Sequence, residues 1–447
     1  MKSKSVSPAR LIAFEILQRV ADGAYASVLL ALREPELSEP DRGLCHELVM
    51  GVLRWQLWLD RLIEYFARRR ISDLDAGVQI ALRLGLYQLR FLSRIPASAA
   101  VNESVKLTNL ARLRSAGAFV NAVLRRATRE PEIDPADNIE DSTERLAVVT
   151  SHPHWLIARW QSAFGAAETE ALAHANNLRA PIAFRVVKKQ AIETEICERL
   201  QKAGATIVPS KVARGAWRIG GATSLLHELV GRGEVYVQDE ASQLVATLLD
   251  LQPGQRVLDL CAAPGSKTTQ IADLRGDESE LVAGDLYEHR LQTIRSAARL
   301  QGIESIRCLS LDATQPLPFA EAVFDRVLVD APCSGTGTLR HNPEIRWRLS
   351  ESDIKKLAER QKRILANAAK VVRPGGRLVY STCSVEWDEN EDVAQWFLTN
   401  NESFRTVDLP ATTSSKSRLG SLRLWPHRQG TDGFFICAME RREKSES

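Results

Sequence analysis

Apolar residues recur at helical spacing through the first part of the chain. The pattern ends at an acidic stretch with two prolines, EPEIDPADNIEDS (130–142), which predicts a linker. Strand signals are few before that stretch, so the pattern predicts a compact helical bundle over residues 8–128. The expected helical segments are 9–20, 44–70, 76–92, 97–112 and 117–130.

The pattern changes in residues 143–235, where short strands alternate with helices. The order is roughly β-α-β-β-α-β, as in ferredoxin-like folds and RNA-recognition modules. The aromatic pairs with which such modules stack on bases are not obvious here, so a structural adaptor and an RNA binder both remain open. The expected helices are 151–165, 169–178, 193–204 and 224–229, and the expected strands are 182–187, 205–208, 216–219 and 234–238.

From residue 238 onward, apolar strand-like runs alternate with helical patterns. Parallel strands joined by crossover helices explain this alternation, and ligands bind in the crevice at the carboxyl ends of such strands. The chain is therefore expected to form three domains, 1–142, 143–235 and 236–447. The expected strands of the last domain are 256–260, 281–286, 306–311, 324–330, 377–382 and 433–440.

Charge separates the helical front from the rest of the chain. The net charge of the 447 residues is +3, but residues 61–129 alone contain 13 basic and 4 acidic residues. A basic helical module suggests contact with a polyanion such as nucleic acid, while a solvated arginine-rich surface is the alternative. The run Arg68, Arg69 and Arg70 is expected to contact phosphates.

Composition excludes several classes of protein. No apolar run reaches the roughly 18 residues of a membrane span, and the first residues lack the apolar core of a secretory signal. Seven cysteines in a chain of this length match neither a disulfide framework nor a zinc pattern. We therefore expect a cytoplasmic, monomeric protein without a metal.

The segment VLDLCAAPGSKT (257–268) is a buried strand, a loop of small residues and the start of a helix. Ala262, Ala263 and Gly265 allow the backbone to approach a ligand closely, and a helix N-terminus offers unpaired N–H groups. The loop is neither the dinucleotide fingerprint nor a P-loop. It suits a cofactor that carries a carboxylate or a ribose, although many such turns are only structural connections.

Acidic residues stand at the ends of successive predicted strands. Besides Asp259 in the first strand, Asp285 is positioned to accept both ribose hydroxyl protons, Asp312 to meet an adenine amino group, and Asp330 ends the fourth strand. A single strand-end Asp is usually a cap or a turn former. Four of them predict one shared cleft, with S-adenosylmethionine as the natural cofactor.

Two cysteines, Cys333 in DAPCSGTG and Cys383 in YSTCSVEWDENE, also follow strand ends. Carbon 5 of cytosine is too electron-poor to take a methyl group directly, but a thiolate that adds to carbon 6 makes carbon 5 nucleophilic. Asp330 could protonate or hydrogen-bond ring nitrogen 3, and Lys267 or a nearby arginine could lower a thiol pKa. Chemistry alone does not decide which cysteine attacks. Cys45, Cys197, Cys308 and Cys437 are expected to be buried and inert.

The motifs LDLCAAPGSKT, DAPCSGTG, RPGGRLVYSTCS and ENE resemble those of the RNA (cytosine-5)-methyltransferases of the Sun family. The resemblance covers essentially the whole chain and is greatest to bacterial members that act on 16S ribosomal RNA (16S rRNA). It implies an all-α NusB-like RNA-binding domain, a small α+β RNA-recognition-like domain and an α/β Rossmann-like class I methyltransferase domain.

The resemblance also implies roles for single residues. Cys383 would be the nucleophile, and Cys333 would help to release the product through the carbon 5 proton. Asp285, Asp312 and Asp330 would complete the cofactor site, assisted by Arg290. The cofactor loop would consist of Cys261, Ala262, Ala263, Pro264, Gly265, Ser266 and Lys267. The family more often has a second glycine where this chain has Ser266, which questions the detailed shape of the loop.

Some alternatives remain open at this level. The segment HNPEIRWRLS (341–350) could hold flanking RNA through Arg346 and Arg348, or it could be a packed Trp347 with solvated arginines. The same chemistry could act on tRNA or 23S rRNA. A methyltransferase for an exocyclic amine would usually have an Asn/Asp-Pro-Pro-aromatic motif where this chain reads Asp330-Ala-Pro-Cys. A non-catalytic RNA-binding protein is supported only by the basic front.

Overall fold

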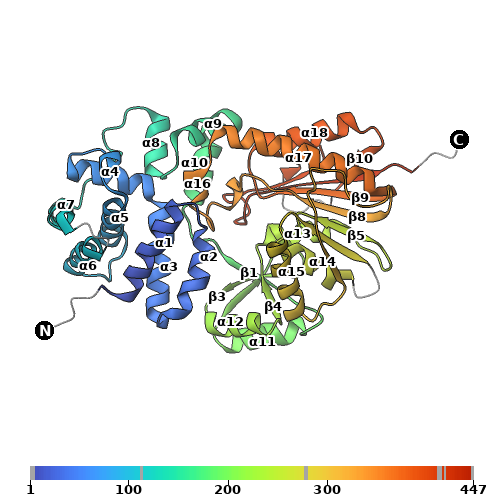
Figure 1. The fold of residues 1–447 in the computed structure, drawn as a ribbon, viewed down its shortest axis with the longest axis horizontal. Coiled ribbons are helices and arrows are strands. Elements are labelled where there is room, and N and C mark those ends of the chain that lie inside the picture. Colours follow the sequence, from blue (N-terminus) through green and yellow to red (C-terminus); the bar gives the residue numbers. More distant parts are fainter. Residues whose placement is uncertain (1–5, 111–113, 276–279, 410–414, 417–418, 444–447) are drawn as a thin grey trace. The chain divides into compact units, whose positions relative to one another are not determined.

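The computed structural model describes residues 6–110, 114–275, 280–409, 415–416 and 419–443 (Figure 1). The chain packs as two compact units. The first, here called the helical unit, consists of Met1–Leu178 and Leu339–Arg348, and the second, here called the catalytic unit, consists of Arg179–Thr338 and Leu349–Ser447. The domain boundaries after residues 142 and 235 stay a prediction.

The helical unit contains the bundle that the apolar spacing predicts. Its core is formed by apolar residues of α1 to α7, and Gly51 lets α3 approach α5, because a Cβ there would lie 2.0 Å from the Tyr87 ring. Its helices are α1 Pro8–Ala21, α2 Ala26–Arg33, α3 Glu39–Arg54, α4 Gln56–Ala67, α5 Ala76–Phe91, α6 Ala97–Leu110, α7 Gly117–Arg129, α8 Ser142–Val149, α9 His154–Phe164, α10 Ala166–Ala175 and α16 Ile345–Arg348, with short 3-10 helices Glu34–Glu36, Ile71–Asp73 and Arg114–Ala116.

Two details of the helical prediction are wrong. The stretch 44–70 is not one helix, because the backbone breaks at Trp55 (ψ 20°) between α3 and α4. Helix α2 was not predicted, since its eight residues are too few to show a clear period. The last two residues of the predicted helix 97–112 lie outside the described residues.

The segment Leu339–Arg348 packs within the helical unit and corrects both interpretations of HNPEIRWRLS. Arg346 is buried and donates to the Ser151 carbonyl (2.9 Å) and to Asn177 Oδ1 (3.1 Å). The Trp347 indole N–H donates to the carbonyl of Leu53 at 2.7 Å, and Arg348 donates to the carbonyl of Val20 at 2.9 Å. Arg346 is therefore not solvated, and the half-buried Arg348 is also bonded within the helical unit, so neither arginine is free to hold RNA.

The catalytic unit begins with a small α+β fold that confirms the predicted β-α-β-β-α-β order. Its antiparallel sheet has the order β2-β3-β1-β4. Both helices pack on the face that bears Phe184 and Val186. On the other face, Arg185 is buried and contacts Thr269 of α14, so this face packs against the helices of the large sheet. The elements are β1 Ile182–Val186, α11 Glu193–Lys202, β2 Thr206–Pro209, β3 Ala216–Gly220, α12 Thr223–Gly231 and β4 Val235–Val237.

The rest of the catalytic unit is built on one large sheet with the order β11-β12-β13-β9-β8-β5-β6-β7, and β10 pairs with β13. All six predicted strands are present. β5 to β9 pair in parallel, as predicted, and β13 is antiparallel to β9. The strands are β5 Val257–Leu260, β6 Leu281–Asp285, β7 Ile306–Ser310, β8 Phe324–Asp330, β9 Val372–Thr382, β10 Phe404–Thr406, β11 Ser415–Lys416, β12 Leu422–Leu424 and β13 Phe434–Arg441.

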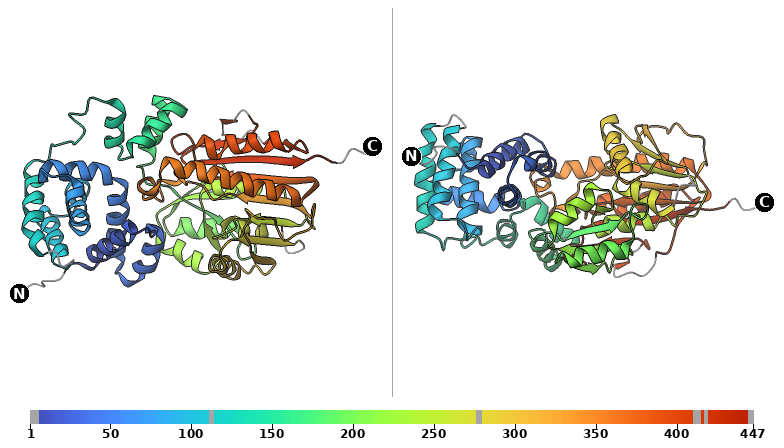
Figure 2. Two further views of the ribbon diagram at one scale, coloured as in Figure 1. Left: turned by 45° about the horizontal axis from the view of Figure 1, so that its top comes forward. Right: turned by 90° about the horizontal axis from the view of Figure 1, so that it is seen from below.

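Helices cover both faces of this sheet (Figure 2). α17 and α18 pack on one face, and α13, α14 and α15 pack on the other. α17 begins with a capping box in which Ser350 and Asp353 bond reciprocally to the backbone. The helices are α13 Glu240–Thr247, α14 Ser266–Arg275, α15 Glu288–Leu300, α17 Glu351–Val371 and α18 Glu391–Asn400, with 3-10 turns Thr336–Thr338 and Trp387–Glu389.

Within the part of the chain that the structure describes, none of the helices combines the length and the apolar character needed to cross a membrane.

Candidate active site

A cavity of about 250 Å³ opens at the carboxyl edge of the parallel strands in the catalytic unit. This is the edge at which ligands bind in open α/β sheets. Its lining brings together most of the residues that the sequence singles out: Cys261, Ala263, Asp285, Arg290, Asp312, Asp330, Cys333 and Cys383. Tyr287, Leu311, Arg360 and Ile364 also line it, and no motif had indicated them.

The loop after β5 has the close-packed backbone that its small residues predict. Gly265 has a φ of 104°, and a Cβ there would lie 3.2 Å from the Cα of Ile294 in α15. Cys261 also has a positive φ (63°), although it is not a glycine. Ser266 begins α14, so the missing second glycine falls at a helical position and does not strain the loop.

Asp285 ends β6 and joins the cofactor loop to α15. Its carboxylate accepts a hydrogen bond from the Ala263 amide (3.1 Å) and lies 3.3 Å from the Arg290 guanidinium. Arg290 also donates to the Ala263 carbonyl (3.3 Å). Asp312 accepts from the amide and hydroxyl of Thr314, which lower its pKa. Both carboxylates therefore stand fixed at the cavity.

Asp259 is the exception among the four strand-end acids. It is buried beneath the loop, is not part of the cavity lining, and accepts a hydrogen bond from Thr268 at 2.6 Å. Burial raises its pKa to about 7. The expectation that all four acids share one cleft is therefore wrong for Asp259, which supports the first turn of α14 instead.

The buried Lys267 and the half-buried Asp330 form an ion pair in the site. Lys267 Nζ lies 2.8 Å from one Asp330 oxygen, and Ser381 of β9 donates to the other at 2.7 Å. Burial lowers the pKa of Lys267, but the Asp330 carboxylate and, more weakly, the Cys383 sulfur outweigh it, so the pKa is raised. Lys267 therefore carries a positive charge close to both Asp330 and Cys383.

The two predicted cysteines meet at the cavity. Cys333 follows β8, Cys383 follows β9, and their sulfurs are 3.4 Å apart. The hydrogen bond to Cys383 and then burial raise the pKa of Cys333 well above its usual value. Cys333 therefore keeps its proton at neutral pH.

A buried carboxylate that sequence reasoning missed joins the two cysteine loops. Glu389 Oε1 accepts from the Ser334 amide (2.8 Å) and from Gln361 (3.0 Å), and Glu389 Oε2 accepts from the hydroxyls of Ser334 and Ser384, both at 2.5 Å. Ser334 follows Cys333 and Ser384 follows Cys383. The ENE motif was the only sequence signal for this group, and it carried no role.

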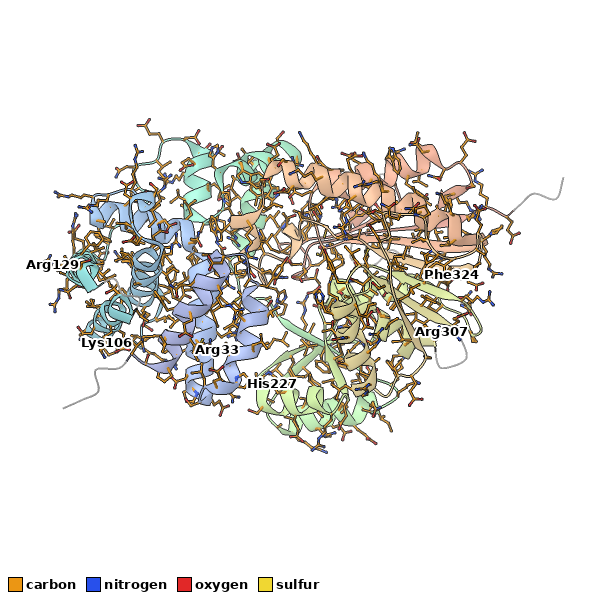
Figure 3. All side chains as sticks on the ribbon, viewed as in Figure 1. Arg33, Lys106, Arg129, His227, Arg307 and Phe324 are labelled. Carbon is orange, nitrogen blue, oxygen red and sulfur yellow. The ribbon has the colours of Figure 1, made fainter. Side chains whose placement is uncertain are left out.

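The remaining predicted residues lie elsewhere. Cys45, Cys197 and Cys437 are buried as expected, whereas Cys308 is half-buried. Arg68, Arg69 and Arg70 are exposed in the helical unit, and Arg69 lies 5.7 Å over the Phe119 ring. Lys106 of α6 and Arg129 of α7 belong to the same basic region (Figure 3). Phosphate contact by these residues stays a prediction.

Known proteins match this chain over its whole length. Family models match in three places, described as 16S rRNA methyltransferase RsmB/F (residues 246–440), the NusB family (7–129) and the ferredoxin-like domain of RsmF/B-like methyltransferases (152–225). These matches confirm the predicted combination of a helical NusB-like, a small α+β and a methyltransferase fold.

Individual relatives agree with the family models. "Probable ribosomal RNA small subunit methyltransferase B" of Bacillus subtilis is 36% identical over 99% of this chain and 100% of the relative. The ribosomal RNA small subunit methyltransferase B of Pseudomonas putida is 37% identical over 96% and 98%. The crystal structure of PH0851 has a TM-score of 0.86 at 28% identity and covers 98% of this chain and 99% of its own.

Proposed function

Because the chain belongs to the 16S rRNA methyltransferase RsmB/F family, we propose that it methylates carbon 5 of a cytosine in 16S rRNA, with S-adenosylmethionine as the methyl donor. The observation that carries this proposal is the pair Cys333 and Cys383, 3.4 Å apart at a cavity that is also lined by Asp285 and Asp312. A thiolate beside a cofactor cleft is the arrangement that covalent activation of a pyrimidine needs.

The residues at the cavity fit the proposed cofactor. Gly265 lets the loop pack closely against α15, because a Cβ there would lie 3.2 Å from the Cα of Ile294, and the neighbouring loop residues Cys261 and Ala263 line the cavity. The carboxylates of Asp285 and Asp312 can accept from ribose hydroxyls and an adenine amino group, and the loop backbone adds N–H donors at the start of α14. When bound, S-adenosylmethionine supplies an electrophilic methyl group.

The proposed reaction then proceeds through the following steps. The Cys383 thiolate adds to carbon 6 of the cytosine, and the electron pair of the ring double bond moves to carbon 5. Carbon 5 would then take the methyl group that the donor supplies, and the bond between that methyl group and the donor sulfur would break with its electron pair left on sulfur. A base removes the carbon 5 proton, the double bond forms again, and the bond between carbon 6 and sulfur breaks, which releases Cys383. Cys333 acts in this release, because its sulfur lies beside that of Cys383.

In this proposal, Asp330 orients the cytosine ring. Its carboxylate already accepts from Lys267 and Ser381, so it is suited to accept a further hydrogen bond from the exocyclic amine of cytosine. This role differs from direct protonation of ring nitrogen 3, which would need a protonated carboxyl group. Lys267 holds Asp330 in place and stabilises negative charge on Cys383.

The biological setting belongs to the same proposal. Cys333 and Cys383 must stay reduced, which suits the cytoplasm. The expectation of a monomer stays a prediction. The basic helical unit binds the RNA, with Arg68, Arg69 and Arg70 at phosphates.

The test uses two cysteine variants with 16S rRNA and S-adenosylmethionine. Cys383→Ala should give no product, and Cys333→Ala should accumulate a covalent protein–RNA complex that survives denaturing electrophoresis. Nucleoside analysis of the product should show 5-methylcytosine, and an N4-methylated product would identify an amine methyltransferase instead. Retained activity of Cys383→Ala would refute the mechanism.

The target RNA is tested separately. Bisulfite mapping of RNA from cells that lack the protein should reveal one cytosine of 16S rRNA that is no longer protected. Loss of protection in tRNA or 23S rRNA would keep the chemistry and change the substrate.

A further inference from the structure

Arg185 is a buried arginine on the sheet of the small α+β fold, outside the cavity described above. It lies in β1, is 4% exposed, and its guanidinium stacks 5.0 Å from the centre of the Tyr236 ring. Its Nε donates to Gln238 at 3.3 Å. Its face of the sheet is the one that RNA-recognition modules use for bases, but here it packs on the large sheet's helices.

The guanidinium of Arg185 bridges two helices that frame the cofactor loop. One nitrogen, Nη2, donates to the hydroxyl of Thr269 in α14 (3.0 Å) and to the side chain of Gln301 (3.1 Å), which follows α15. The other, Nη1, lies 3.8 Å from the buried carboxylate of Asp273. A planar guanidinium with several fixed partners has little freedom to move.

Thr269 connects Arg185 to the cofactor loop by hydrogen bonds. Its hydroxyl accepts from Arg185 and donates to the carbonyl of Gly265 at 2.8 Å. Thr269 is fully buried, so no solvent competes for these bonds. Gly265 is the residue whose positive φ and contact with Ile294 set the shape of the loop. The path from Arg185 to the loop is therefore two hydrogen bonds long.

We infer that Arg185 is a positioning residue for the S-adenosylmethionine site: through Thr269 it fixes Gly265, and with it the loop Cys261–Lys267, in the conformation that binds the cofactor. The small α+β fold thus has a function in cofactor binding besides linking two parts of the chain. The inference rests on the proposed function only in the identity of the cofactor, because the hydrogen bonds do not depend on which RNA atom is methylated.

The experiment measures the Kd for S-adenosylmethionine by calorimetry in the full chain, together with the Tm. Arg185→Met keeps the length of the side chain and removes its donors, and Thr269→Val keeps the volume and removes the hydroxyl. Each should raise the Kd about tenfold, the loss expected for one hydrogen bond to a charged group. The double variant should be no weaker than the single ones, since both break the same path.

Matched controls separate positioning from general stability. Arg199→Met in α11 breaks an ion pair with Glu234, which precedes β4, and Thr247→Val removes a hydroxyl that bonds to the Leu244 carbonyl in α13. Both should leave the Kd within about twofold, the usual scatter between independent sites. Thr269→Ser keeps the hydroxyl and should restore binding.

An unchanged Kd in Thr269→Val would overturn the inference, even if Arg185→Met did not fold. A lower Tm with an unchanged Kd would also overturn it, because that is the result of a purely structural role. Failure of the unmodified protein to bind S-adenosylmethionine would overturn the inference and the proposed function together. A product other than 5-methylcytosine would change the proposed function and leave the inference standing.

Discussion

Glu389 offers the most direct test of how the two cysteine loops are held together. Its carboxylate is fully buried and accepts four hydrogen bonds from Ser334, Ser384 and Gln361. Glu389→Ala would leave two buried donors without an acceptor: the Ser334 amide and one N–H of Gln361, whose other N–H bonds to the Pro332 carbonyl. A buried donor that is left without an acceptor costs about 1–3 kcal/mol of folding free energy, so we expect a loss of roughly 2–6 kcal/mol for the two donors.

Glu389→Gln should lower the folding free energy far less than Glu389→Ala, because the two carboxylate oxygens of Glu389 accept from different kinds of donor. Oε1 accepts hydrogen bonds from two N–H groups, which can only donate. Oε2 accepts from two hydroxyls, which can also act as acceptors. An amide with its carbonyl at Oε1 and its NH₂ at Oε2 satisfies all of them. Burial also raises the pKa of Glu389, so its charge is costly to keep. We expect a loss of about 1 kcal/mol, the net contribution of one hydrogen bond.

The assay is urea unfolding of both variants, with Glu359→Ala as the control. Glu359 is an exposed α17 carboxylate paired with Lys362, and such pairs contribute about 0.3–0.5 kcal/mol. The midpoint should shift without a change in slope. Equal losses in Glu389→Gln and Glu389→Ala would refute the hydrogen-bond argument, because the charge would then matter more than the donors.

Two further predictions concern the loop after β5. The raised pKa of Asp259, about 7 against 3.8 when unfolded, means that its stabilising contribution is complete below about pH 4 and is lost as the pH rises to about 7, by up to roughly 4 kcal/mol. Asp259→Asn cannot ionise, so in urea unfolding its stability relative to the unmodified protein should rise between pH 5 and pH 8, and a constant difference would contradict this. Gly265→Ala should cost about 1–3 kcal/mol of folding free energy through backbone strain. It should also weaken binding of S-adenosylmethionine, because the added Cβ would meet Ile294. The control is Gly254→Ala, which also has a positive φ but has open space around it, so it should lower only the stability.

Local sequence patterns were sufficient to predict the helices and strands and part of the candidate site. Strand runs that end in Asp285 and Asp330 predicted both the strands and the edge at which those carboxylates lie, because parallel strands direct their carboxyl ends to the same side. The same logic brought Cys333 and Cys383 to one cavity. It misassigned Asp259, which pairs with Ala283 and Leu328, two residues before Asp285 and Asp330, and therefore lies deeper in the sheet than the edge that lines the cavity.

The partners of buried polar groups could not be predicted in this way. Arg185 stands in a strand pattern in which a charged residue would ordinarily face solvent. Its burial depends on Thr269, Asp273 and Gln301, which are distant in sequence and come together only in the folded chain. Periodicity within one element carries no information about such contacts.

The segment Leu339–Arg348 is a second case in which the sequence did not reveal the partners of polar side chains. Its arginines and tryptophan have the composition of an RNA contact, yet they satisfy backbone carbonyls of the helical unit at Val20, Leu53 and Ser151. The Leu53 carbonyl belongs to the last turn of α3, where the helix leaves its carbonyls without intrahelical partners. A segment that follows the Cys333 loop in the chain thus belongs to the helical unit and completes helix ends there. Composition could suggest that these side chains bind something polar, but only the fold could show that the polar group is the protein's own backbone.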